Sequence, residues 1–328
     1  MSNLETPVKT EQKSSKTGTG GKQSAFYNRK FKLGNHRYHV GETITSYTLL
    51  LPTIITLIVL FVLPLIMLIV LSFMEYRMTT GVMKFNGIEN FLYLFRNDDF
   101  WQAMQNTVVF AVVKLGLDLG LALAVAFMLD SRVWFRKIMR TIYFSPVVTP
   151  VVACSLIWLW FYDPGIGPFN QILGWLGMEP LKWLYDEKTA LMSIIIFSVW
   201  HGLGYNVVLL LSGLQGISGE YLEAAQLDGA DEWTIIRKIK LPMLKPIINF
   251  VLMMGIINAF KAFSEVNVMT PDGGPNYSTA LIVNYIYKVG FTNGRMGRAA
   301  AASIILFFVI FSLTILRSKI GGSKEIGD

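Results

Sequence analysis

The 328-residue sequence is short of charge. Charged residues make up 16% of it, whereas a soluble domain usually carries about 25%, and hydrophobic residues make up 53%. Cysteine is also scarce: Cys154 stands alone, so no disulfide can form within the chain, and cysteine usage says nothing about the redox state of its compartment. The shortage of charge favours an integral membrane protein over a soluble domain.

The motifs of several chemistries are missing. No Gly-x-x-x-x-Gly-Lys-Ser/Thr loop, which would cradle nucleotide phosphates, occurs anywhere in the sequence. Three scattered histidines and one cysteine make no recognisable zinc site, and no cluster of catalytic polar groups gathers at one membrane interface. We therefore expect that the chain is not an enzyme, does not hydrolyse ATP itself and holds no cofactor of its own.

Long apolar runs dominate the rest of the sequence. A membrane-spanning helix needs about 20 mostly apolar residues. Six windows meet this length, and they lie at about 47–73, 104–129, 141–162, 190–214, 243–263 and 299–316. The sequence thus predicts an all-α membrane protein with six transmembrane helices: a first span at 47–73, a core domain over 104–316, and tails at 1–46 and 317–328.

The distribution of basic residues predicts the orientation. Lys and Arg number 19 in the two tails and the connections 130–140 and 215–245, against 9 in the other three connections. Basic residues accumulate on the cytoplasmic side of membrane proteins. Both termini and the 215–245 loop are therefore predicted to be cytoplasmic. The basic tail at 1–46 is rich in small polar residues and is predicted to be largely disordered.

The 215–245 loop has an unusual composition. It is acidic at first and basic later, and the small residues Ala224 and Ala225 lie between leucines. Small side chains let another surface approach the backbone closely, and Gly229 permits a sharp change of direction between two helical stretches. The residues alone leave two readings open: a solvated amphipathic loop, or a docking surface for another protein.

This loop resembles the EAA signature of ABC import permeases, with its spacing intact. The matching residues are Glu223, Ala224, Ala225, Gly229, Ile239, Leu241 and Pro242. The resemblance implies the type I ABC importer fold, in which this loop forms a coupling helix that sits in a cleft of the ATPase subunit. Carried over, Glu223, Ala224, Ala225 and Gly229 contact the ATPase, and Leu241 and Pro242 fix the angle at which the chain returns to the membrane.

The resemblance covers nearly the whole chain after residue 46. The stretches 86–91, 200–205, 273–275, 285–287 and 296–297 are similar to the carbohydrate-importing branch, of maltose and lactose type. This implies a permease subunit in the cytoplasmic (inner) membrane of a bacterium or archaeon. It implies a heterodimer with a second homologous permease, a sugar or oligosaccharide delivered by an extracytoplasmic solute-binding protein, and two ABC ATPase subunits that bind ATP and magnesium. No nucleic acid is implied.

Polar residues inside spans are functional candidates, because they are costly in a membrane. Aligned on the EAA loop, the sugar-contacting positions of maltose-type permeases fall on Ser198, His201, Gly202, Tyr205, Met254, Ile257, Asn258 and Lys261. Tyr205 can stack on a pyranose ring, and Asn258 can bond hydroxyls. His201 and Lys261 depart from the maltose pattern. The alternative for His201 is a hydrogen bond to a neighbouring helix. The alternative for Lys261 is a position at the outer edge of the membrane.

Other readings remain. Lys114 and Asp118 stand four residues apart in the second span, so they can neutralise each other as a structural pair, touch the partner permease, or act as a gate.

Two alternatives concern the function. The transported solute can be a compound other than a sugar, such as glycerol phosphate. A secondary transporter needs no ATPase, but it predicts inverted repeats, which the sequence lacks, and it leaves the EAA spacing unexplained.

Overall fold

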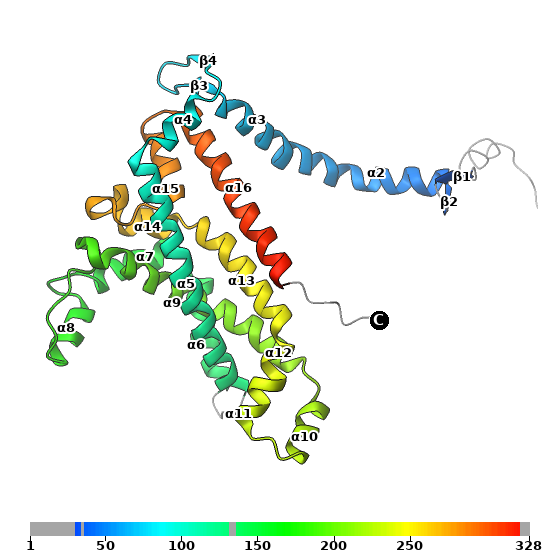
Figure 1. Cartoon of the computed structure of the whole chain (residues 1–328), viewed down its shortest axis with the longest axis vertical. Helices are drawn as coiled ribbons and strands as arrows, with labels where there is room; N and C mark the ends of the chain where they lie inside the picture. Colours follow the sequence, from blue (N-terminus) through cyan, green and yellow to red (C-terminus); the bar gives the residue numbers. More distant parts are fainter. Residues whose placement is uncertain (1–29, 34–35, 131–135, 322–328) are drawn as a thin grey trace, which may run out of the picture. The chain divides into compact units, whose positions relative to one another are not determined.

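The computed structural model describes residues 30–33, 36–130 and 136–321, and helices dominate this part of the chain (Figure 1). The chain divides into two compact units, Met1–Ile66 and Met67–Asp328. The prediction of a disordered tail over 1–46 falls mainly on residues 1–29, which lie outside the described residues.

The first unit contains a short antiparallel hairpin and a long apolar helix. Its elements are β1 (Lys30–Leu33), β2 (His36–His39), α2 (Val40–Leu57), the π-helical turn η1 (Ile58–Val62) and the start of α3 (Leu63–Ser72). Pro64 has no N–H to donate, and the wider turn η1 directly before it is a common way to absorb such a gap in the helical bonds. The apolar stretch Thr45–Ser72 is long enough to cross a membrane and matches the predicted span at 47–73.

The second unit holds the other helices. They are packed along the long pair α5 and α9, with α13 against α5 and α16. The elements after α3 are β3 (Met74–Tyr76), β4 (Met83–Phe85), α4 (Glu89–Phe95), α5 (Asp98–Asp130), α6 (Arg136–Val148), α7 (Val151–Phe161), α8 (Pro168–Trp175), η2 (Trp183–Tyr185), α9 (Glu187–Gln215), α10 (Gly219–Leu227), α11 (Glu232–Ile235), η3 (Ile236–Lys240), α12 (Leu241–Met243), α13 (Lys245–Phe260), α14 (Ser264–Met269), η4 (Pro271–Gly273), η5 (Pro275–Tyr277), α15 (Ile282–Tyr287), η6 (Lys288–Thr292) and α16 (Met296–Gly321). Within this unit, α4 and the β3–β4 hairpin lie at one end, and α10 and α11 lie at the opposite end (Figure 1).

The third predicted span is broken. The sequence predicted one helix over 141–162, whereas the structure has α6 and α7, whose axes turn by 108° between Val148 and Val151. The residue before a proline is pushed out of the helical conformation, and Pro150 supplies no backbone N–H. The chain therefore leaves the helix at Thr149 and restarts at Val151.

Five helical stretches within the described ranges are long and apolar enough to span a membrane, and the bent pair makes a sixth if it forms one span. The five are Thr45–Ser72, Asp98–Asp130, Glu187–Gln215, Lys245–Met269 and Met296–Lys319. This confirms the predicted all-α membrane fold with up to six spans.

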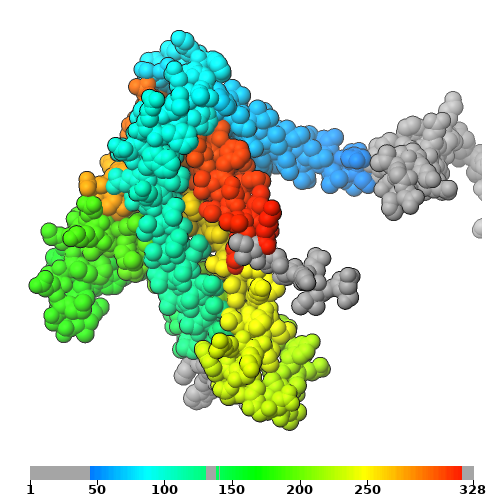
Figure 2. Space-filling model, viewed as in Figure 1, coloured from blue at the N-terminus to red at the C-terminus, as the bar shows by residue number. Residues whose placement is uncertain are grey.

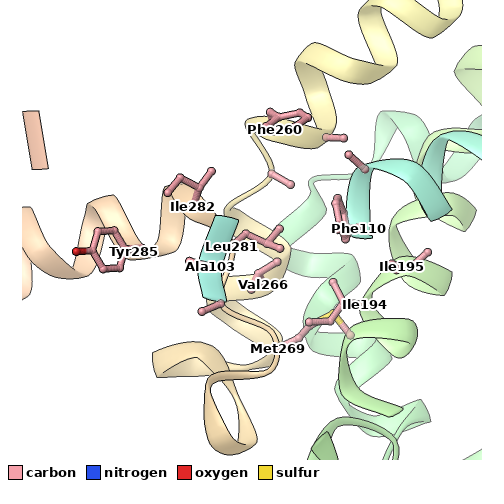
Figure 3. Close-up of a cluster of buried hydrophobic side chains, with 14 of the residues drawn as sticks. Ala103, Phe110, Ile194, Ile195, Phe260, Val266, Met269, Leu281, Ile282 and Tyr285 are labelled. Carbon is pink, nitrogen blue, oxygen red and sulfur yellow. The ribbon is translucent and has the colours of Figure 1, made fainter. Parts of the chain in front are cut away.

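Two buried apolar clusters hold the second unit together. The larger joins α5, α9, α13, α14 and α15 around side chains such as Phe110, Ile194 and Leu281 (Figure 3). The smaller lies nearer α10 and packs Leu244, which is fully buried, against Leu129 of α5 and Leu214 of α9. Burying a leucine side chain contributes roughly 1.5–3 kcal/mol. The smaller cluster therefore fixes the point where the 215–245 loop rejoins the helices.

Candidate coupling loop and transport pathway

The predicted coupling segment begins with a short, exposed helix. Ser218 caps α10, because its hydroxyl oxygen accepts a hydrogen bond from the backbone N–H of Glu220 at 3.3 Å. Glu223 and Ala224 are exposed and Ala225 is half-buried. No residue of α10 is buried, and the segment stands out at its end of the second unit (Figure 2). An exposed helix with small residues at its centre is a surface that another protein can approach closely.

Gly229 ends this helix in a left-handed turn. Its φ is +80°, a region that side chains with a Cβ rarely adopt. The Gly229 N–H donates to the Gln226 carbonyl at 3.0 Å, and the Ala230 N–H donates to the Ala225 carbonyl at 2.9 Å. These two bonds form a Schellman motif with glycine at its left-handed position. The direction of the chain after α10 therefore depends on the backbone freedom of Gly229.

The part of the loop after Gly229, residues 231–245, leads back to the long helices and is called the return limb; it begins at a second helix cap. Asp231 accepts a hydrogen bond from the backbone N–H of Thr234 at 3.2 Å and so starts α11. Hydrogen bonds from the side chain and backbone of Thr234 lower the pKa of the Asp231 carboxyl group. The cap therefore keeps its negative charge at neutral pH, next to the positive end of the helix dipole.

The rest of the limb is tied to the long helices. Lys240, at the end of η3, pairs with Asp130 at the end of α5 at 2.5 Å. Leu241 and Pro242 begin α12 and are exposed, three and two residues before the buried Leu244. The wider turn η3 directly precedes Pro242, which has no N–H to donate. Their predicted role in setting the return angle stays a prediction.

The predicted pathway residues on α9 lie on one side of that helix. Ser198, Gly202 and Tyr205 are separated by four and three residues, which brings them to one face. Ser198 is buried, and its hydroxyl donates to the Glu265 carboxylate of α14 at 3.5 Å. Tyr205 is 43% exposed. The sequence reasoning missed Glu265, which lies in the first turn of α14, just after the predicted fifth span at 243–263.

His201 bonds to the broken span. Its Nε2 lies 3.1 Å from the carbonyl oxygen of Thr149, and because a carbonyl only accepts, Nε2 must donate. Thr149 sits in the break between α6 and α7, where its carbonyl lies outside both helices. His201 therefore donates a hydrogen bond to a backbone carbonyl that lies outside both helices because of the break. This is the neighbouring-helix alternative that the sequence left open for His201.

We expect His201→Leu to lower the stability of the purified permease by about 1–3 kcal/mol, because it leaves the Thr149 carbonyl without a donor. His201→Gln keeps a donor at a similar reach and should lose much less. Thermal unfolding in detergent measures both variants. Equal unfolding temperatures for the two would show that the Thr149 bond contributes nothing.

Gly202 opens toward a buried ion pair. A Cβ at Gly202 would lie 3.7 Å from Nζ of Lys114, at ordinary contact distance. Lys114 pairs with Asp118 one turn along α5, as the spacing predicted, and both side chains are largely buried. The second carboxylate oxygen of Asp118 is buried without a partner. The structure thus brings Lys114 beside the predicted pathway, while the role of the pair stays open.

Asn258 and Lys261 are the predicted pathway residues on α13. Both side chains are exposed at the end of α13. The backbone N–H of Lys261 donates the last hydrogen bond of this helix to the Ile257 carbonyl. Among the described residues, no hydrogen bond or ion pair joins either side chain to Ser198, His201, Gly202 or Tyr205. The common face of the α9 residues follows from their spacing, and a shared pathway with Asn258 and Lys261 stays a prediction.

An open groove of about 780 Å³ lies at the break between α6 and α7, and Thr149, the partner of His201, lines it. It is lined by Thr141, Phe144, Ser145, Val148, Thr149, Pro150 and Val208. The sequence reasoning did not find this groove, although Pro146 and Pro150 signalled irregular backbone. Irregular backbone at membrane depth is tolerated where protein buries it or where it lines a water-filled cavity.

The membrane helices, the exposed helix–glycine–helix loop and the broken span define a transport subunit of the membrane. The chain belongs to the family described as "Binding-protein-dependent transport system inner membrane component", whose pattern matches residues 116–320. The chain is therefore a subunit of a binding-protein-dependent ABC importer in the inner membrane, and its family is one of transport rather than catalysis.

Individual relatives agree. The chain is 30% identical to the arabinooligosaccharides transport system permease protein AraP of Halalkalibacterium halodurans, over 95% of this chain and 99% of that one. It is 33% identical to the trehalose/maltose transport system permease protein MalF of Thermococcus litoralis, over 72% and 80%. A solved bacterial ABC transporter involved in alginate import shares the fold, with a TM-score of 0.77 at 24% identity, covering 88% of this chain and 98% of that one.

Proposed function

We propose that the chain forms, with a second homologous permease, the pathway for a sugar or oligosaccharide delivered by an external solute-binding protein. Two ABC ATPase subunits, which bind ATP and magnesium, drive the transport. The observation that carries this proposal is the exposed helix α10 with its Schellman turn at Gly229, in a segment whose sequence resembles a coupling helix. The orientation predicted from basic residues puts this segment on the cytoplasmic side.

The helix α9 gives the proposed coupling a mechanical route. It runs without interruption from Ser198 and Tyr205 to Gln215, three residues before the cap of α10. The return limb is anchored on the same helices through Leu244 and the Lys240–Asp130 pair. A displacement of α10 by a closing ATPase therefore moves α9 and the ends of α5 and α13 together. The spans then rock between inward- and outward-facing states around the pathway, and ATP hydrolysis resets them.

The side chains near the pathway suit a neutral, hydroxyl-rich solute. Tyr205 exposes an aromatic ring that can stack on the C–H face of a pyranose, and Asn258 can bond hydroxyls in either direction. The names of the relatives point to oligosaccharides. Glycerol phosphate is the alternative solute, and the buried cation of Lys114 beside Gly202 is the feature that favours it.

Uptake by membrane vesicles that hold the complete importer tests this function. We expect uptake of labelled oligosaccharide to require both ATP and the solute-binding protein. Uptake that persists without the ATPase subunits would instead support a secondary transporter.

Tyr205→Ala and Asn258→Ala should each lower transport about fivefold or more, since stacking and hydroxyl bonds each contribute about 1 kcal/mol. The ATPases should still co-purify with both variants, because neither residue lies near α10. Tyr185→Ala is the matched control: it removes a tyrosine that is 65% exposed in η2, outside the pathway. Normal transport through both pathway variants would mean that the pathway lies elsewhere.

A further inference from the structure

A pocket of about 480 Å³ with a charged lining lies in the second unit, among the elements at the end opposite α10. The β3–β4 hairpin, α4 and the start of α16 surround it. Its charged lining consists of Arg77, Arg96, Arg295, Arg298, Glu75 and Glu89. By the predicted orientation this end faces the outside of the membrane, so the pocket belongs to the side that a solute-binding protein approaches.

The charges in this pocket are unbalanced. Glu75 is shared by two guanidinium groups, because Arg77 lies 2.7 Å and Arg295 3.9 Å from the same carboxylate oxygen. Arg96 and Arg298 have no ion pair with any carboxylate of the described residues. Four guanidinium groups thus face two carboxylates, Glu75 and Glu89, so the pocket keeps a net positive charge. The planar groups of Arg96 and Arg298 can each donate a pair of parallel hydrogen bonds.

One of these groups is held in place. The Arg298 guanidinium lies over the ring of Tyr93, 3.5 Å from its centroid. Stacking on an aromatic face leaves the N–H edges of a guanidinium free, and it reduces the freedom that binding an anion would otherwise remove. A carboxylate, which matches the guanidinium fork, is the chemical group that this arrangement fits best.

The two faces of α4 indicate which kind of partner can bring that carboxylate to the pocket. The pocket is lined by Glu89 and Tyr93 of α4 and by its C-cap residue Arg96, which share one face at helical spacing. Phe91, on the opposite face, borders a separate apolar groove with Phe73 and α16. The helix thus lies between an apolar groove and a polar pocket, so the pocket opens on the water side. A soluble protein reaches it more readily than a lipid headgroup whose chains occupy the groove.

We infer that this pocket, the outer arginine pocket, is where acidic side chains of the external solute-binding protein dock on this subunit. The inference rests on the proposed function, since it needs such a protein to exist for this importer. Arg96 and Arg298 donate hydrogen bonds to the partner's carboxylates, while Glu75 holds Arg77 and Arg295 and offsets one of their two charges. Opposite charges across such an interface raise the association rate and fix the register of the two proteins.

The test measures binding of the importer's own solute-binding protein to the complete importer in nanodiscs at low salt. The double variant Arg96→Gln/Arg298→Gln should weaken binding about tenfold or more, and the loss should shrink at high salt. Arg298→Lys keeps the charge without the fork and should fall in between. Lys188→Gln is the matched control, because it removes an exposed cation on the same predicted side, outside the pocket.

Arg96 is exposed, so Arg96→Gln alone keeps the test valid if the double variant assembles poorly. Unchanged binding in all arginine variants overturns the inference, and the proposed function stands if that protein still stimulates ATP hydrolysis. Loss of a co-purified anionic lipid, with binding of the solute-binding protein unchanged, also overturns it and assigns the pocket to a headgroup. If the unmodified importer neither binds that protein nor responds to it, both the inference and the proposed function fail.

Discussion

Gly229→Val should abolish most of the ATPase activity that the solute-binding protein stimulates, while the protein still inserts into the membrane. At φ +80° a residue with a Cβ costs roughly 1–2 kcal/mol, and a β-branched residue costs more. No atom lies within 4 Å of the place where the Cβ would stand, so the cost comes from the backbone rather than from a clash within the chain. The Schellman bonds to Ala225 and Gln226 break, and α10 loses its fixed exit angle.

A graded series makes this prediction sharp. Gly229→Ala should lower stimulated activity roughly 5- to 30-fold, which is the factor for 1–2 kcal/mol. Gly229→Asn should be milder, because asparagine tolerates the left-handed region. Gly219→Ala is the matched control: Gly219 begins the same helix, has open space around it and has no positive φ. Full stimulation in Gly229→Ala and Gly229→Val would contradict the assignment of this loop to coupling.

The coupling loop was predictable because its determinants are local. The turn at Gly229 and the caps of α10 and α11 are set by residues within a few positions of one another. Charge counting predicts a cytoplasmic position for the loop, and the EAA spacing predicts a coupling role for it. The structure adds the physical reason for the glycine. Contact of Glu223, Ala224, Ala225 and Gly229 with an ATPase remains a prediction, and so does the part of Leu241 and Pro242.

The spans were predictable for a similar reason, and the break was not. Hydropathy and length identify each apolar run without knowledge of its neighbours. The window 141–162 passes that test, yet its prolines turn the axis by 108°. Prolines inside a span do not reveal whether the helix bends or breaks, because that depends on whether another helix can satisfy the freed carbonyl. Here His201 does so from α9, a partner 52 residues away.

The pathway was the least predictable part. Ser198, His201, Gly202 and Tyr205 belong to one helix, so their common side follows from spacing. Glu265 went unnoticed because it lies beyond the predicted window 243–263, and only the break in the helix after Phe260 lets α14 bring it to Ser198. The close packing of α6 against Gly204 was not predictable either, because a glycine in an apolar helix does not indicate which element packs against it.

Gly204→Ala should prevent normal assembly of the membrane helices. A Cβ at this position would overlap the carbonyl oxygen of Tyr143 and stand 3.0 Å from the Cα of Phe144. These are backbone atoms of α6, so no side-chain rotation relieves the contact, and the two helices must separate. Overpacking of this kind costs about 1–3 kcal/mol or more, and small residues are what allow membrane helices to approach so closely. We expect less monodisperse protein in detergent and a lower unfolding temperature.

Gly→Ala variants at two other helical positions serve as controls for the unfolding temperature of Gly204→Ala. Gly120→Ala in α5 meets open space, so only the gain in helix propensity acts there and the unfolding temperature should rise slightly. Gly255→Ala meets only the end of the Leu115 side chain, which can rotate away, so its effect should be intermediate. The order of the three variants matters more than any single value, because it separates a backbone clash from the small gain in helix propensity that alanine brings at each site. A stable, monodisperse Gly204→Ala protein would mean that α6 and α9 do not pack as closely as the structure has them. The bond between His201 and Thr149, on the same pair of elements, would then be in question as well.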